Sequence, residues 1–156
     1  MPSKKRRQPK QIVNRRARFD YAIGDTYIVG MELSGAETKA LRLGLGNLVG
    51  SYVTIKDDQL WLINATISGT GSVRISDQDQ TRTRRLLAKR REINQMIQAK
   101  QQGRTIVPLE ILNRGRYIKL KIAIAQGKKR YDKRQTIKKR SEERQMANAV
   151  KTRHLN

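Results

Sequence analysis

The sequence contains no cysteine, which excludes a disulfide framework and any metal site built on thiolates. Its one histidine, His154, lies near the end of the chain, so no group of histidines can hold a metal or carry acid–base catalysis. The apolar runs are much shorter than the ~20 residues that a membrane-spanning helix needs. Residues 1–10 also lack the hydrophobic core of a signal peptide. We therefore expect a soluble, cytoplasmic protein.

Acidic residues are few relative to basic ones. The chain has 35 lysines and arginines against 13 aspartates and glutamates, which gives a net charge of +22. An excess this one-sided is typical of a protein that binds a polyanion. A membrane surface is an alternative, but it requires a basic helix with a strong apolar face, and the C-terminal region offers only Ile137, Met146 and Val150. RNA is therefore the favoured partner.

The positive charge is concentrated at the two ends. Residues 1–18 contain eight basic residues and no acid, and residues 126–156 contain eleven basic residues and three acids. Segments this charged and this poor in apolar residues do not fold alone. We predict a basic arm over 1–13 that is disordered when free, an RNA-binding domain over 14–127, and a basic tail over 128–156. The tail is expected to be disordered when free and helical when bound to RNA.

Two patterns in the first half predict strands. Residues 19–33 are rich in aromatic and β-branched residues that alternate on either side of Gly24-Asp25, where we expect a bulge. Residues 51–56 and 59–64 are β-rich runs separated by Asp57-Asp58. A two-residue connection between such runs predicts a tight hairpin.

Between these strands the sequence predicts a short helix. Ser34 and Glu37 have the spacing of a capping box, and Gly44 ends the pattern. Lys39 and Arg42 share one side of this helix. Taken alone, that pair fits a solvated face better than a binding site.

The middle of the chain predicts a loop and then a long helix. Residues 68–81 are polar and glycine-rich, which is typical of a surface loop, with a short strand at 73–75. Residues 81–102 carry apolar residues at helical spacing, so we predict a helix there, although its first turns are unfavourably basic. Trp61 is expected in the core because large aromatic side chains bury well.

The last apolar segments predict a second hairpin. Residues 105–111 and 116–125 flank a glycine-containing turn, and the second run alternates between basic and aliphatic residues. Short antiparallel strands with one short and one long helix predict a mainly β fold with helices. We expect a closed antiparallel β-barrel like the oligonucleotide-binding fold, with two packed helices and basic N- and C-terminal tails.

No pattern in the sequence predicts catalysis. The acids are scattered, and Asp57-Asp58, Asp77 and Asp79 are better interpreted as turn residues. Gly44-Leu45-Gly46 lacks the remaining residues of a phosphate-binding loop. We expect a binding protein and not an enzyme, with no cofactor, no metal and no small-molecule substrate.

Six motifs in order resemble the SmpB family, the small protein B that binds transfer-messenger RNA (SsrA RNA) in bacterial ribosome rescue. The resemblance covers about residues 14–139. It rests on Asn14-Arg15-Arg16-Ala17-Arg18-Phe19-Asp20-Tyr21, Gly35-Ala36-Glu37-Thr38-Lys39-Ala40-Leu41-Arg42 with Gly46-Asn47-Leu48, Ser51-Tyr52-Val53, Arg82-Thr83-Arg84-Arg85-Leu86-Leu87, Arg91-Glu92-Ile93 and Gly127-Lys128-Lys129-Arg130-Tyr131-Asp132-Lys133-Arg134.

The resemblance implies a function in trans-translation. Such a protein binds the tRNA-like domain of transfer-messenger RNA, and its C-terminal tail enters the decoding centre and empty messenger channel of a stalled ribosome. The positions that the resemblance assigns to RNA binding, with their basic neighbours, are Asn14, Arg16, Arg18, Lys39, Arg42, Leu87, Lys119, Lys128 and Lys129. Those that it assigns to the ribosome-contacting tail are Tyr131, Asp132, Lys133, Arg134, Lys138, Lys139 and Arg140.

The chain departs from the family pattern at three positions. Ile28 stands where the family usually has an acid, Thr66 where a histidine is frequent, and Ala40 where a serine is frequent. The residues of the tail also predict a helix induced by ribosomal RNA, with Asp132 as its N-cap. A structural ribosomal protein with basic arms that thread ribosomal RNA is the alternative, since composition alone fits it equally.

Overall fold

The computed structural model describes residues 11–153, and the predictions for residues 1–10 and for His154 lie outside this part. The elements are, in order, β1 (Ile12–Val13), α1 (Arg15–Asp20), β2 (Tyr21–Met31), α2 (Gly35–Arg42), β3 (Gly46–Asn47), β4 (Tyr52–Lys56), β5 (Gln59–Ile63), β6 (Thr66–Ile67), α3 (Asp77–Gln80), β7 (Arg84–Leu87), α4 (Arg90–Gln101), β8 (Thr105–Leu112), β9 (Lys119–Gly127) and α5 (Arg130–Arg153).

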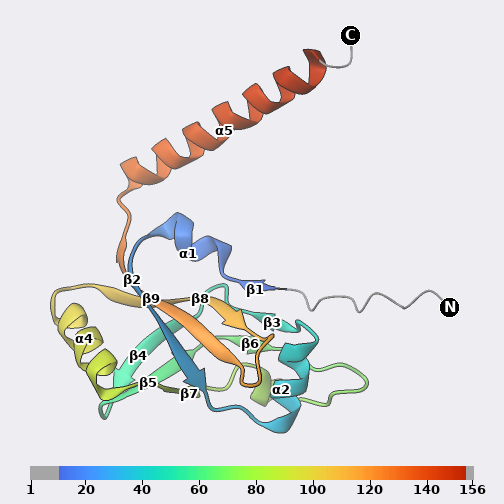
Figure 1. Cartoon of the computed structure of the whole chain (residues 1–156), viewed down its shortest axis with the longest axis vertical. Helices are drawn as coiled ribbons and strands as arrows, with labels where there is room; N and C mark the ends of the chain where they lie inside the picture. Colours follow the sequence, from blue (N-terminus) through green and yellow to red (C-terminus); the bar gives the residue numbers. More distant parts are fainter. Residues whose placement is uncertain (1–10, 154–156) are drawn as a thin grey trace.

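The main sheet is antiparallel and its strands bond in a ring. Neighbouring strands follow the order β4, β5, β7, β2, β9 and β8, and β8 returns to β4 through the pair Val53 and Ile106 (Figure 1). β3 and β6 form a separate small ladder. The predicted mainly β, antiparallel architecture with helices is confirmed.

The predicted N-terminal arm ends earlier than the sequence indicated. Ile12 is buried, and its strand β1 pairs with β8 in the register Ile12–Ile111. The interpretation of 1–13 as a disordered arm is therefore wrong for its last residues, because one isoleucine within the polar arm buries its side chain in the main core. The helix α1, which follows directly, was also not predicted.

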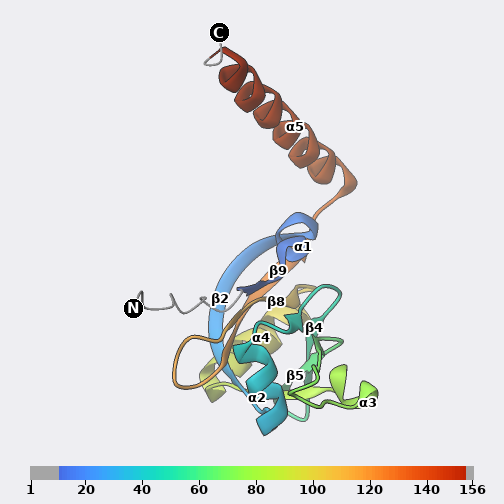
Figure 2. The same ribbon diagram turned by 90° about the vertical axis from the view of Figure 1, so that its right-hand side faces the viewer.

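The long strand β2 curves over the body, as Figure 2 shows, and it carries the predicted bulge. Its register against β9 shifts between Ile23 and Thr26. A Cβ atom at Gly24 would lie 3.0 Å from the carbonyl oxygen of Ile124, so the close backbone approach there needs glycine. The capping box of α2 is also confirmed, since Ser34 Oγ accepts from the Glu37 amide and the Glu37 carboxylate accepts from the Ser34 amide.

The hairpin of β4 and β5 turns at the predicted residues. Asp57 and Asp58 have φ angles of 51° and 57°, which a two-residue hairpin turn of type I′ requires. Trp61, however, is only half-buried, and its Nε1 donates to the carbonyl oxygen of Lys56 at 3.4 Å. The prediction of a core tryptophan is wrong because strand alternation gives the inward positions to Leu60 and Leu62.

The predicted helix over 81–102 divides into a strand and a shorter helix. Its first part is β7, in which Arg84 and Leu86 point inward and their neighbours are exposed. The helix α4 begins only at Arg90. Buried and exposed residues alternate over only four positions in β7, which is too short a pattern to indicate a strand. Leu86 and Leu87 also happen to fit the helical spacing of the apolar residues in α4, so the sequence predicted one continuous helix. The preceding loop contains the helix α3 and an isolated bridge between Thr70 and Val73, in place of a strand at 73–75.

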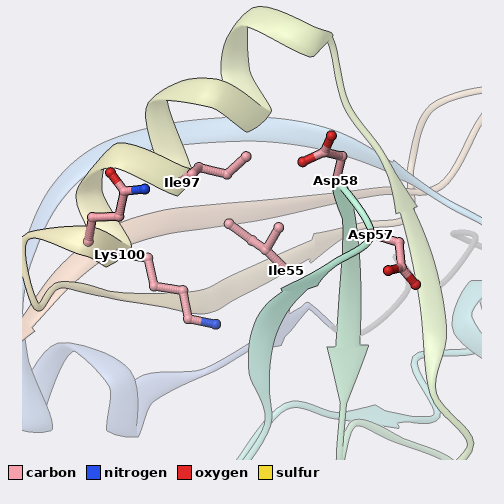
Figure 3. Close-up of a pocket in the computed structure, with 6 residues that line it drawn as sticks. Ile55, Asp57, Asp58, Ile97 and Lys100 are labelled. Carbon is pink, nitrogen blue, oxygen red and sulfur yellow. The ribbon is translucent and has the colours of Figure 1, made fainter.

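Helix α4 packs beside the hairpin of β4 and β5. In Figure 3, Ile97 of α4 and Ile55 of β4 point toward one another across a pocket of about 370 Å³. Asp57 and Asp58 lie at the rim of this pocket, and Asp58 pairs with Arg90 at 2.9 Å.

The apolar side chains form two clusters. The larger lies inside the ring of strands, and the smaller joins Ala17 of α1 to Val107, Leu109, Ala123 and Ala125 on β8 and β9. The second cluster holds α1 on the sheet. Helix α5 extends away from the strands in both views (Figure 1, Figure 2). The tail is helical here over Arg130–Arg153, and its expected disorder in the free protein stays a prediction.

Candidate RNA-binding surface

The outer face of β2, β7 and β9 brings together two of the predicted residues, Leu87 and Lys119. Gly30 of β2 is paired on one side with Leu87 and on the other with Lys119, and Ile28 is paired with Lys121. We call these five residues the outer face. Ile28 and Leu87 are 54% and 51% exposed, so two aliphatic side chains lie open to solvent on this face.

The outer face is hollowed into a shallow pocket of about 550 Å³. Lys89 and Glu92, at the start of α4, border it beside Leu87 and Lys119. A Cβ atom at Gly30 would lie only 3.2 Å from the Leu87 Cβ, so the missing side chain keeps this pocket open. An apolar floor with lysines at its edge can take the flat face of a base and the phosphate next to it. Ile28, in place of the family's acid, removes a charge that phosphate would meet.

Helix α2 carries two further predicted residues, and they behave differently. Lys39 is exposed and free to meet a phosphate. Arg42 instead binds the turn between β8 and β9. Its Nη1 donates to the carbonyl oxygens of Asn113 (2.7 Å) and Gly115 (2.6 Å), and its Nη2 donates to that of Arg116 (2.9 Å). Arg42 therefore positions the turn, and its guanidinium is largely used within the protein.

Asn14 does not reach the surface. It is 4% exposed, and its Nδ2 donates to the carbonyl oxygens of Leu48 (3.2 Å) and Pro108 (3.0 Å). Its Oδ1 accepts from the amide of Ala17, which caps α1. The polar atoms of this side chain are thus bonded within the protein, and the assignment of Asn14 to RNA binding stays a prediction.

The remaining basic residues gather where α1 meets the end of β9. Arg16 and Arg18 are exposed on α1, and Arg16 pairs with Asp20 at 3.2 Å. Lys128 Nζ donates to the carbonyl oxygen of Arg18 at 3.1 Å, while Lys129 is exposed. These cations form a second positive surface that leads directly into the tail.

The tail contacts the body through α1. Lys133 pairs with Asp20 at 3.0 Å, and the Arg140 guanidinium lies 5.9 Å from the centre of the Phe19 ring. The hydrogen bond from Lys133 lowers the pKa of Asp20, burial opposes this shift, and Arg16 adds to it. The α5 helix begins at Arg130, so Asp132 lies in its first turn and is not the predicted N-cap.

Other predicted tail residues are turned to solvent along α5. Tyr131 is exposed, and its hydroxyl accepts a hydrogen bond from Gln135. Lys138 lies 4.0 Å from Glu142, a separation at which an exposed pair contributes little. The exposed members of the predicted set are Tyr131, Asp132, Arg134, Lys138, Lys139 and Arg140. Such a helix presents cations and almost no apolar face, which suits a polyanion and not a protein groove.

Sequence reasoning missed the ion cluster in which the buried Glu37 pairs with the buried Arg84 and the partly exposed Arg82. Both arginines donate to the Glu37 carboxylate, from Arg82 Nε at 2.8 Å and from Arg84 Nε at 2.9 Å. Burial lowers the pKa of Arg84, and the charge of Glu37 opposes that shift. The capping box revealed the local partner of Glu37 but gave no sign of arginines more than forty positions away.

Within residues 11–153, no helix is both long and apolar enough to cross a membrane. In the same part of the chain, no three metal-ligating side chains come together. Exposed cations gather on the outer face, around α1 and along the tail.

Comparison with known proteins agrees with this arrangement. The chain matches the family described as SmpB protein over residues 11–152. It is 46% identical to the SsrA-binding protein of Gloeothece citriformis, covering 88% of this chain and 90% of that one. It is 47% identical to the SsrA-binding protein of Maricaulis maris, covering 89% and 90%.

A solved structure described as "tmRNA-SmpB: a journey to the center of the bacterial ribosome" is similar, with a TM-score of 0.63 and 35% identity. The alignment covers 81% of this chain and 94% of that one. Given also the family match over nearly all described residues, this chain belongs to the SmpB protein family.

Proposed function

We propose that this protein binds transfer-messenger RNA and brings it to stalled ribosomes, as a non-enzymatic factor of trans-translation in the cytoplasm. One observation carries the proposal: relatives named SsrA-binding proteins are more than 45% identical to this chain over about nine-tenths of their length. The cationic outer face and tail give the chain the surface chemistry that this function requires.

The proposal assigns a separate RNA target to the ring of strands and to the tail. The ring of strands is a closed barrel of the oligonucleotide-binding type, and its outer face binds the tRNA-like domain. Leu87 takes a base, and Lys119, Lys39, Arg16, Arg18 and Lys129 bind phosphates. The tail, from Tyr131 to Arg140, enters the decoding centre and the empty messenger channel. Support for this division comes from the separation of the tail helix from the strands (Figure 1).

A gel shift with two RNAs tests the proposal. In vitro transcribed transfer-messenger RNA is compared with an ordinary tRNA at several salt concentrations. Specific recognition predicts tighter binding to transfer-messenger RNA, with an affinity that falls with log salt by roughly 0.7–0.9 per neutralised phosphate. Equal, salt-labile binding to both RNAs would argue against it.

Two lysine variants locate the surface. Lys119→Ala removes a cation from the outer face and should weaken binding while lowering the salt slope by about one phosphate contact. Lys56→Ala is the matched control, because Lys56 is equally exposed but adjoins Asp57 and Asp58. Loss of affinity in both variants would place the RNA elsewhere.

Sucrose gradients separate this proposal from a structural ribosomal protein. A rescue factor should be sub-stoichiometric on ribosomes and should leave them in a high-salt wash. A structural component should stay with its subunit in the same wash.

A further inference from the structure

The turn between β8 and β9 presents an aromatic side chain that neither the fold nor the proposed site uses. Tyr117 is 67% exposed, although most of the large hydrophobic side chains in the described chain are buried. The guanidinium of Arg116 lies 5.4 Å from the centre of its ring, which is a cation–π distance. Arg114 is also exposed on this turn. The turn thus combines one aromatic face with two arginines.

This turn is held rigidly against α2. Arg42 donates three hydrogen bonds to its carbonyl oxygens, and in return the buried Asn113 donates from Nδ2 to the carbonyl oxygen of Leu41 at 2.7 Å. Figure 1 and Figure 2 both show the turn beside α2. Because hydrogen bonds fix both the backbone carbonyls of this turn and the Asn113 side chain, the turn loses little conformational entropy when a ligand binds.

The turn is continuous with the outer face. Tyr117 is exposed two residues before Lys119, the first residue of β9, and the buried Ile118 lies between them. Lys119 is in turn paired with Gly30, next to Leu87. An RNA strand that lies on the outer face would therefore reach Tyr117 within a nucleotide or two.

We propose that the β8–β9 turn is a base-stacking platform, in which Tyr117 stacks on an unpaired base of the bound RNA while Arg116 backs the ring and Arg114 binds an adjacent phosphate. An exposed aromatic ring on a fixed support, flanked by cations, is the arrangement that recognises single-stranded nucleic acid. The inference rests on the proposed function and adds to it a contact for one unpaired nucleotide. A protein partner is less favoured, because the flanking side chains are all cationic.

The test compares Tyr117→Ala, Tyr117→Phe and wild type for binding to the tRNA-like domain of transfer-messenger RNA. Stacking of one base predicts that Tyr117→Ala binds about tenfold more weakly, within the range known for alanine substitution of a stacking residue. Tyr117→Phe, which keeps the ring, should bind within about twofold of wild type. Because stacking involves no phosphate, the salt slope of Tyr117→Ala should equal that of wild type.

Three results would overturn the proposal. If Tyr117→Ala binds the RNA with wild-type affinity, Tyr117 makes no stacking contact. If Tyr117→Ala and Tyr117→Phe lose the same amount of affinity, the tyrosine hydroxyl and not the ring makes the contact. A reduced salt slope in Tyr117→Ala assigns it to displaced cations. Thermal melting by circular dichroism verifies that each variant is folded. If wild type itself binds transfer-messenger RNA no better than tRNA, the proposed function fails; if wild type binds specifically and Tyr117→Ala does too, only the stacking platform fails.

Discussion

The carboxylate of Glu37, on α2, accepts a hydrogen bond of 2.9 Å from Nε of Arg84, on β7, and both side chains are fully buried. Arg84 also donates to the carbonyl oxygens of Ala65 (2.7 Å), Asp79 (3.0 Å) and Gln80 (3.0 Å). One guanidinium therefore ties α2 to β7 and to the loop around α3. Since α2 carries Lys39 and supports the β8–β9 turn, this ion pair positions part of the RNA surface.

Breaking the pair on one side should destabilise the fold strongly. Glu37→Gln leaves Arg84 buried without its counter-charge, and such a change costs about 3–5 kcal/mol. Urea unfolding monitored by circular dichroism measures it. The double variant Glu37→Gln with Arg84→Met should recover much of the loss, because it removes both charges. A double variant as unstable as Glu37→Gln would show that the other hydrogen bonds of Arg84 dominate.

The same carboxylate should make stability depend on acid pH. Burial raises the pKa of Glu37, but the bonds from Arg82 and the Ser34 amide, with both arginine charges, outweigh it and leave the pKa below the ordinary 4.5. A group whose pKa is lower in the native state contributes stability above its unfolded pKa, and this contribution is lost as the pH falls below it. The stability difference between wild type and Glu37→Gln should thus shrink between about pH 6 and pH 3. A constant difference over this range would exclude Glu37 as the titrating group.

The errors in the sequence-based fold share a physical origin. The capping box of α2 and the turn at Asp57-Asp58 were predictable because both are local, set by the conformation of a few adjacent residues. β7 was not, since the charge of Arg84 is balanced inside the core by Glu37, which lies 47 positions away. Arginine is usually exposed, so a sequence pattern predicts a surface position for it unless its buried counter-charge is known.

The candidate site shows the same division between local and distant signals. The alternation of basic and aliphatic residues in β9 predicted from sequence alone that Lys119 is exposed to solvent. That Ile28 and Leu87 are exposed on the same face is visible only once the strand pairing is known. The burial of Asn14 was not predictable for the same reason. The carbonyl groups that its side chain satisfies belong to two distant segments.

Asn14→Ala should reduce stability without reducing the RNA affinity of the folded protein. The change removes the cap of α1 and the Nδ2 hydrogen bonds to the carbonyl oxygens of Pro108 and Leu48, at a combined cost of about 2 kcal/mol. The Leu48 carbonyl keeps its bonds from Ser51. Arg16→Ala is the contrasting variant, because Arg16 is exposed and its pair with Asp20 adds little stability. Thermal melts and gel shifts on both proteins should therefore show opposite patterns. Equal affinity loss in folded Asn14→Ala would restore a direct RNA contact by Asn14.

Arg42→Lys should loosen the β8–β9 turn even though the charge is kept. A lysine cannot reproduce the planar, forked donation to three carbonyl oxygens. Amide hydrogen exchange over residues 113–117 should become faster, and it should stay at the wild-type rate in Lys39→Ala, where an exposed cation of the same helix is removed. Unchanged exchange in Arg42→Lys would mean that Asn113 alone fixes the turn.

The helix α5 should depend on RNA for its order, because little within it or around it stabilises a helix. Its side chains are almost entirely polar, and Lys133 and Arg140 contact α1. Eleven basic residues against three acids over 126–156 repel one another at low salt. A peptide of residues 126–156 should therefore show little helix by circular dichroism in low-salt buffer and gain helix when an RNA neutralises it. Ser141→Pro, which breaks the helix at its middle, should abolish the gain. A wild-type peptide that is strongly helical without RNA would show instead that the order of α5 is intrinsic, and that the tail reaches the ribosome as a preformed rod.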